Sequence, residues 1–216
     1  MTFGKPGRPP ADRLARQREI FEAAAPLILT VGARKLSMRA AADAAYLSVG
    51  GLYHYFPSKR DLLMHGLSHQ ARRRIFMEGR AELRRSAGLD REANLDLYVE
   101  RTLALWRFVH PSVQAALELG YDEFQDRMEA GFAASPAEFA EVLRMVTGER
   151  DRERLAALVR AVQRLALGTV VARDFDPDAA AAALRAILSG THHSDPDGNA
   201  TESTQPAGDE STFGSD

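Results

Sequence analysis

Residues 37–60, SMRAAADAAYLSVGGLYHYFPSKR, form the stretch that decides the fold. Ser37 can cap an alanine-rich helix over Met38–Ala45, because its side-chain oxygen can accept a backbone N–H of the first turn. A turn follows at Tyr46, and Ser48 can cap a second short helix in the same way. Helices this short cannot bury a core alone, so the pattern predicts that both pack on a third.

The third helix is predicted over Arg16–Val31, where apolar residues recur at helical spacing. Its core face would contain Ile20, Ala24, Leu27, Ile28 and Val31. Pro26 removes one backbone hydrogen bond, so a kink or a restart of the helix is expected there. Three helices of this pattern are typical of a helix-turn-helix module, whose second short helix enters the major groove of DNA.

The same residues resemble the tetracycline-repressor (TetR/AcrR) family of bacterial transcriptional regulators. The resemblance rests on three segments: GRPP (7–10), REIFEAAAPLILTVGARKLS (18–37) and LSVGGLYHYFPSKRDLL (47–63). Ser48, Gly50, Tyr53, Tyr55, Phe56 and Lys59 match the family's pattern of serine, glycine, tyrosine, an aromatic cluster and lysine. The resemblance implies an all-α protein with an N-terminal three-helix helix-turn-helix domain and a C-terminal helical ligand-binding and dimerisation domain.

Three positions depart from the family pattern. Tyr46 stands where a turn glycine is usual, which predicts a wider turn or a less positive φ. Ala41 replaces a larger aliphatic residue and thins the packing under the second helix. Gly51 stands where a threonine or a similar polar residue often reads DNA.

The chain has 216 residues, enough for one or two domains with a core of their own. Its hydrophobic content is 45%, but no run approaches the length of a membrane-spanning helix, and the N-terminus lacks the apolar stretch of a signal peptide. We therefore expect a cytoplasmic protein without a membrane partner. The absence of cysteine excludes disulfides and thiolate metal sites.

The net charge of −2 conceals a strong polarity along the chain. Residues 1–60 carry ten Lys or Arg against four acids, whereas residues 190–216 carry six acids and no Lys or Arg. A phosphate-binding surface requires a basic module of this kind. The chain is thus divided into four segments: a flexible basic arm (1–11), a helix-turn-helix domain (12–60), a helical effector-binding and dimerisation domain (61–189), and a disordered acidic tail (190–216).

The predicted DNA-binding residues come from the arm, the two short helices and the start of the next helix. They are Lys5, Arg8, Ser37, Arg39, Ser48, Val49, Gly51, Tyr53, His54 and Lys59. The arm suits a narrow minor groove, Val49 can meet a thymine methyl group, and Gly51 lets the backbone approach closely. The resemblance implies phosphate contacts for Ser37, Tyr53 and Lys59.

Beyond the helix-turn-helix, the breaks and apolar spacing predict a series of further helices. They are Lys59–Arg85, Arg91–Val109, Pro111–Tyr121, Glu123–Ala133, Pro136–Thr147, Asp151–Asp174 and Asp178–Ser189.

Aromatic, Met and polar residues of these helices suggest a pocket for a small apolar or aromatic effector. Its candidates are Trp106, Phe108, His110, Gln114, Tyr121, Phe124, Met128 and Gln163, with ordinary core as the alternative. A dimer interface is predicted from Leu155, Leu158, Val162, Leu165, Leu184 and Ile187, with intramolecular core as the alternative. Asp61, His65 and His69 share one predicted helix face, but polar residues at this spacing are commonplace, and we predict neither a metal site nor a cofactor.

No nucleophile–base pair, phosphate loop or HExxH motif occurs, so the sequence does not predict an enzyme. It favours a ligand-responsive transcriptional repressor that binds a palindromic operator as a homodimer and is released by the effector. The alternatives are a DNA-bound adaptor protein without an effector and a small helical enzyme with a vestigial DNA-binding head.

Overall fold

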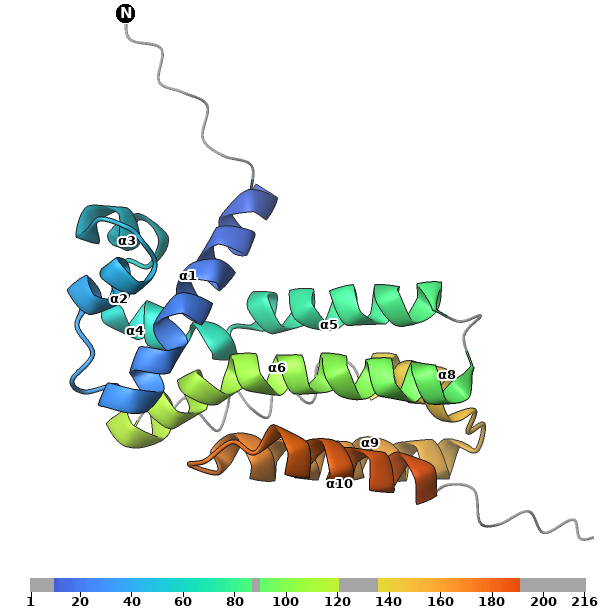
Figure 1. Ribbon diagram of the computed structural model, residues 1–216. Coiled ribbons are helices and arrows are strands. Elements are labelled where there is room, and N and C mark those ends of the chain that lie inside the picture. The colour runs from blue at the N-terminus through green and yellow to red at the C-terminus, as the bar shows by residue number, and fades with distance from the viewer. Residues whose placement is uncertain (1–9, 87–89, 121–135, 191–216) are drawn as a thin grey trace, which may run out of the picture.

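The computed structural model describes residues 10–86, 90–120 and 136–190, and all regular structure within them is helical. Figure 1 shows α1 (Pro10–Val31), α2 (Met38–Ala44), α3 (Val49–Tyr55), α4 (Lys59–Leu63), a 3₁₀ turn η1 (His65–Leu67), α5 (His69–Arg85), α6 (Arg91–Leu119), α8 (Pro136–Thr147), α9 (Arg152–Val171) and α10 (Pro177–Ser189). The predicted all-α class is confirmed. Residues 1–9 of the predicted arm, residues 191–216 of the predicted tail and the predicted helix Glu123–Ala133 lie outside the described residues. Residues 10 and 11, predicted as part of the flexible arm, instead begin α1.

The two short helices begin at the predicted caps. The Ser37 side chain accepts the N–H of Ala40 at 3.1 Å, and the Ser48 side chain accepts the N–H of Gly51 at 3.0 Å. Both bonds satisfy a donor that has no partner inside its own helix. The start of α3 is therefore fixed locally, by the bond between Ser48 and Gly51.

The turn between α2 and α3 differs from the prediction at Tyr46. Its φ is +54°, in the left-handed region that favours glycine, so the turn is not flattened to accommodate a side chain. The turn closes through the N–H of Leu47, which donates to the carbonyl of Ala42 at 2.9 Å. The Tyr46 side chain is 96% exposed and contributes little packing.

The strain at Tyr46 predicts that Tyr46→Gly stabilises the fold. Removing Cβ relieves about 1–2 kcal/mol of left-handed strain, which the greater chain entropy of glycine offsets in part. We expect the free energy of unfolding, measured by urea denaturation, to rise by roughly 0.5–1 kcal/mol. Tyr46→Ala is the control, because it removes the exposed ring but keeps Cβ. An equal gain for both variants would assign the effect to the ring instead of the backbone.

The predicted single helix Lys59–Arg85 is wrong, since the structure divides it into α4, η1 and α5. The break lies where η1 packs against α6. A Cβ on Gly66 would lie 2.6 Å from the carbonyl oxygen of Phe108, and the Gly66 N–H donates to the Ser112 hydroxyl at 2.9 Å. Ser68 then caps α5 by accepting the N–H of Ala71 at 3.1 Å.

The predicted break at Pro111 is also wrong, because α6 runs through it without interruption. Pro111 is buried within the protein, and this packing outweighs the lost backbone hydrogen bond. Helix α1 likewise continues through Pro26 without a restart, and it begins at Pro10, ahead of the predicted Arg16.

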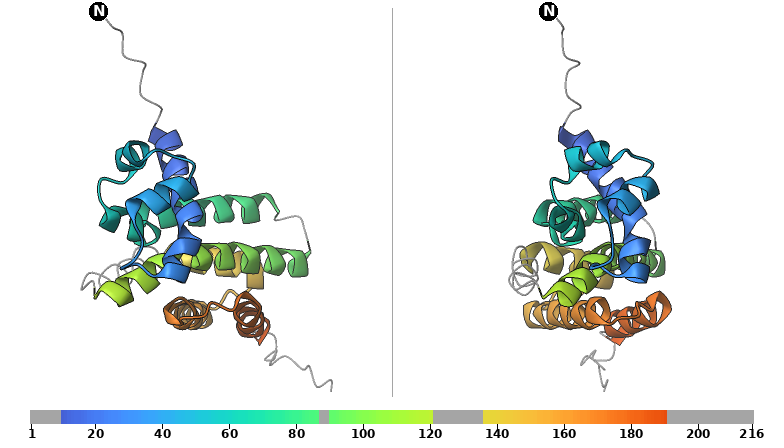
Figure 2. Two further views of the ribbon diagram at one scale, coloured as in Figure 1. Left: turned by 60° about the vertical axis from the view of Figure 1, so that its left-hand side comes forward. Right: turned by 90° about the vertical axis from the view of Figure 1, so that its left-hand side faces the viewer.

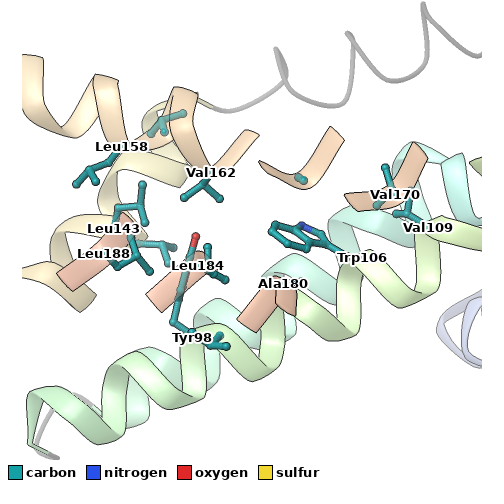
Figure 3. Packing of buried hydrophobic residues seen from close by; sticks show 14 of the residues in the cluster. Tyr98, Trp106, Val109, Leu143, Leu158, Val162, Val170, Ala180, Leu184 and Leu188 are labelled. Carbon is teal, nitrogen blue, oxygen red and sulfur yellow. The ribbon is translucent and has the colours of Figure 1, made fainter. Parts of the chain in front are cut away.

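Two hydrophobic clusters divide the interior. The head cluster joins α1–α4 to parts of α5 and α6. It includes Ile20, Phe21, Ile28, Leu36, Leu52, Phe56, Leu62, Leu63, Ile75 and Phe108. The body cluster joins α5, α6, α8, α9 and α10, and Figure 3 shows its centre around Tyr98, Trp106, Val162 and Leu184. Helix α6 contributes to both clusters and packs against α1, α4, η1, α5, α8, α9 and α10. Helices α1–α4 are called the head and the remaining helices the body.

None of the helices in the described ranges has the length and apolar character needed to cross a membrane.

Candidate DNA interface and ligand cavity

Helix α3 presents one face to the surface and one to the head cluster. Val49, Gly50, Tyr53 and His54 are exposed, whereas Leu52 is fully buried. Figures 1 and 2 show α3 at the outer edge of the head, away from α8, α9 and α10. The exposed face is therefore accessible to a large partner such as a DNA groove.

The other predicted contact residues of the head lie on α2, on α4 or at a helix cap. Arg39 is exposed on α2, and Ser37 and Ser48 are exposed caps. Each of these hydroxyls accepts an N–H and keeps its own proton for donation. Lys59 is half-buried at the start of α4, and its Nζ donates to the carbonyl of Arg34 at 3.0 Å. Lys5 and Arg8 lie outside the described residues.

Two residues of α1 hold the end of α3, and sequence reasoning did not identify them. Arg13 donates from Nη2 to the carbonyl of His54 at 2.7 Å, and its guanidinium lies 5.6 Å from the centroid of the Tyr55 ring. Gln17 donates to the carbonyl of Tyr55 at 2.9 Å. Arg13 and Gln17 are four positions apart and therefore share one face of a helix. The prediction missed this because it began the helix at Arg16, after Arg13.

The two adjacent glycines of α3 have different surroundings. A Cβ on Gly51 would lie 3.2 Å from the Ser48 hydroxyl, so this glycine faces its own N-cap. A Cβ on Gly50 would meet nothing within 4 Å. Gly50, which was not among the predicted contact residues, is thus the open position where another backbone can come close.

Gly50→Ala should separate stability from DNA binding. Alanine adds no clash within the chain and suits a helix better, so we expect the free energy of unfolding to rise by about 0.5–1 kcal/mol. Binding to duplex DNA, measured by fluorescence anisotropy, should weaken several-fold because the new methyl group lies on the exposed face. Unchanged DNA affinity would show that no DNA atom approaches this position.

His65 lies inside the protein at the junction of head and body. Its ring makes edge contacts with those of Phe21, Phe56 and Phe108, at centroid distances of 5.5, 5.2 and 5.8 Å. Burial lowers the pKa of His65 to about 4. Asp61 is exposed and accepts a hydrogen bond from Ser58, and across the described ranges no group of three His, Asp or Glu could hold a metal ion.

The buried imidazole predicts an acid-sensitive fold. Between its usual pKa of 6.5 and about 4, the unfolded chain binds a proton that the folded chain excludes. Stability should therefore fall as the pH drops through this window, by up to about 1.4 kcal/mol per pH unit. Urea denaturation at about pH 7 and about pH 5 measures the loss. The His65→Leu variant should lose less free energy of unfolding between these two pH values than the unchanged protein does. Equal losses in the two proteins would show that His65 is not the cause.

A cavity of about 140 Å³ lies in the body between α5, α6, α8 and α9. Its apolar wall includes Ile75, Phe76, Leu83, Tyr98, Leu105, Trp106, Val109, Phe139, Leu143 and Val162. Its polar wall includes His69, Arg72, Arg73, Arg80, Arg101, Thr102, Glu138 and Gln163. The space suits a small, largely apolar molecule with a polar end.

Of the predicted pocket residues, Trp106 and Gln163 line this cavity. Phe108 instead packs in the head cluster, 5.1 Å from Phe21 between ring centroids. His110 Nδ1 lies 3.0 Å from the carbonyl oxygen of Val170, and Gln114 donates to the same oxygen at 3.1 Å. These two polar residues tie α6 to the end of α9. Tyr121, Phe124 and Met128 lie outside the described residues.

Most of the predicted dimer residues are not on the surface. Leu155, Leu158, Val162 and Leu184 are buried in the body cluster, and Figure 3 labels the last three among its members. For these four, the structure fits the alternative of intramolecular core. Leu165 and Ile187 are partly buried. The exposed positions of α9 and α10 include two apolar side chains, Leu167 and Val171, and several arginines. They also include the small residues Ala156, Ala157, Gly168, Ala179, Ala182 and Ala186.

A family model described as "Bacterial regulatory proteins, tetR family" matches residues 20–65. Among curated proteins, none matches the chain. The fatty acid degradation regulator FadR from Bacillus halodurans has a similar structure, with a TM-score of 0.55 and 17% identity over 87% of this chain and 100% of that one. A putative TetR-family transcriptional regulator from Rhodococcus sp. is 22% identical, with a TM-score of 0.49 over 82% of this chain and 96% of that one.

Proposed function

Because residues 20–65 match the DNA-binding domain of tetR-family regulatory proteins, we propose that the chain is a repressor controlled by a small molecule. It binds a palindromic operator as a homodimer and leaves it when the body cavity is occupied. The observation that carries the proposal is the capped helix α3, whose exposed face lies at the outer edge of the head.

In this proposal α3 enters the major groove. Val49 and Tyr53 face the DNA, and Gly50 permits close approach of the backbone. Ser37, Ser48 and Lys59 contact phosphates, which orient the head without reading sequence. Arg13 and Gln17 act indirectly by holding the end of α3.

The proposed dimer places two heads on the two half-sites of the operator. The exposed Leu167 and Val171 of α9 support this assembly, because a second subunit would bury their apolar surface. The small exposed residues of both helices, such as Gly168 and Ala182, would let the helices of two subunits approach closely. Of the interface residues predicted from the sequence, Leu165 and Ile187 are only partly buried and are kept in the proposed interface.

Effector control follows from the position of α6. This helix lines the cavity with Trp106, and its last turn carries Glu118 beside the head. The Glu118 carboxylate accepts the N–H of Ala33 at 2.6 Å and that of Arg34 at 3.0 Å. Arg34 in turn donates to the carbonyl of Glu118 and accepts from Lys59. A shift of α6 would therefore move the loop that positions Lys59.

The carboxylate form of Glu118 is favoured at this junction. Hydrogen bonding from the Arg34 backbone, followed in importance by that from Ala33 and the charges of Arg34 and Lys59, lowers the pKa of Glu118. An effector changes DNA affinity only if it binds the DNA-competent and the released arrangement with different affinity. The cavity favours this scheme over an adaptor with a filled core.

Lys59→Ala tests the DNA-binding part of the proposal. Loss of one phosphate contact should weaken binding to all duplexes alike and reduce the slope of log affinity against log salt by about one unit. Anisotropy titrations over a series of salt concentrations measure this slope. Arg150→Ala is the control, because Arg150 is exposed in the body between α8 and α9. An unchanged slope for Lys59→Ala would exclude the phosphate contact.

Glu118→Gln tests the connection between α6 and the head. The amide keeps the shape but loses the charge that accepts both N–H groups, so the amides of Ala33 and Arg34 should exchange with solvent about tenfold faster. Hydrogen exchange followed by NMR measures this change. Glu92→Gln, at the opposite end of α6, should leave both amides unchanged. Equal exchange in all three proteins would contradict a coupling role for Glu118.

A further inference from the structure

We infer that the effector cavity selects an apolar molecule that ends in an anionic group, with the anion bound by arginines of α5 and α6. The inference rests on the proposed function, because it assigns the chemical class of the effector. It is carried by the charges in the cavity wall, by the burial of Arg80 and by the packing of Arg101.

The charged groups of the cavity wall are unbalanced. Among the residues that the structure describes, four arginines line it, namely Arg72, Arg73, Arg80 and Arg101, against one carboxylate, Glu138. The rest of the wall is largely aliphatic and aromatic. In such low-dielectric surroundings, a positive excess repels a cationic ligand and attracts an anionic one more strongly than it would in water.

The arginines of α5 share too few carboxylates on α8. Arg73 pairs with Glu138 at 3.2 Å, and Arg80 approaches the same carboxylate at 3.6 Å. Arg80 and Arg84 both pair with Glu141, the latter at 2.6 Å. Three guanidinium groups thus share two carboxylates along the contact of α5 with α8. A carboxylate or phosphate of a ligand would supply the missing negative charge.

Arg80 is the arginine that is placed to bind the anionic group of the ligand. Its side chain is only 12% exposed, and it lines the cavity. Its Nε is buried and has no hydrogen-bond acceptor among the residues that the structure describes. A buried donor of this kind requires an acceptor, and an anionic oxygen is the strongest acceptor available to a guanidinium. An alkyl or aromatic ligand without an oxygen would leave this donor unsatisfied.

Arg101 brings a guanidinium from α6 to the same wall. Its side chain lies across α5 at Gly79, where an added Cβ would be 3.3 Å from the Cβ of Arg101. Glu82 holds its guanidinium at 2.7 Å. The anion site is therefore formed by two helices, one of which, α6, also reaches the head.

The size of the cavity links binding to movement. A volume of about 140 Å³ is close to that of an engineered cavity of ~150 Å³ that holds benzene. A longer molecule fits only if the helices around it separate. Its anionic group would compete with Glu138 and Glu141 for the arginines of α5, and this competition would loosen the contact between α5 and α8.

Three ligands that share one alkyl chain test the charge selection: octanoate, octanol and octylamine. Isothermal titration calorimetry on the full chain should give an octanoate affinity at least about tenfold above that of octanol, with octylamine the weakest. Equal affinities for octanoate and octanol would overturn the inference and leave the apolar effector cavity standing. If none of the three binds, the effector cavity of the proposed function fails as well.

Variants locate the anion site. Arg80→Gln should lower octanoate affinity about tenfold and leave octanol affinity within about twofold, and Arg80→Lys should restore part of the loss. Arg74→Gln is the matched control, because Arg74 lies on the same helix, pairs with Glu78 at 2.9 Å and does not line the cavity. If Arg80→Gln does not fold, Arg101→Gln takes its place. Octanoate binding that is unchanged in Arg80→Gln and Arg101→Gln, or lowered equally in Arg74→Gln, would overturn the assignment.

Discussion

At Gly66 the chain passes so close to α6 that any side chain would collide with the carbonyl oxygen of Phe108. The Gly66 N–H donates to the buried hydroxyl of Ser112, so the approach is held by a hydrogen bond as well as by packing. Head and body are joined at this point, because η1 connects α4 to α5 while it rests on α6. The aromatic surroundings of His65 and the direction of α5 both depend on this contact.

Helix α6 connects this contact to the cavity in the body and to the loop before α2 in the head. Toward the body, it supplies Tyr98 and Trp106 to the cavity wall. Toward the head, its last turn carries Glu118, which holds the loop before α2. Its continuity through Pro111 matters for this arrangement, since a break there would separate the cavity from the head. A rigid helix that contributes to two cores is a suitable physical carrier of the proposed control.

The ion pairs between α5 and α8 bear on ligand binding as well as on stability. Exposed pairs of this kind contribute little to the free energy of folding. Those at Arg80 differ, because the guanidinium is largely withdrawn from solvent and lies against an apolar cavity. Burial of a charge is costly unless it is well paired, so the arrangement at Arg80 is more readily understood as a binding feature than as a stabilising one.

The sequence by itself determined the helical class, the caps at Ser37 and Ser48 and the exposed helix that carries the proposed DNA contacts, because each depends on residues a few positions apart. Tertiary structure decided the break at Gly66, the continuity of α6 through Pro111 and the inward orientation of Leu158 and Val162. These features depend on which helices meet, and helical spacing alone does not distinguish a core partner in the same chain from one in a second subunit. Tertiary structure also decided the surroundings of the cavity arginines of α5, because they lie beside glutamates of α8 only after folding brings the two helices together.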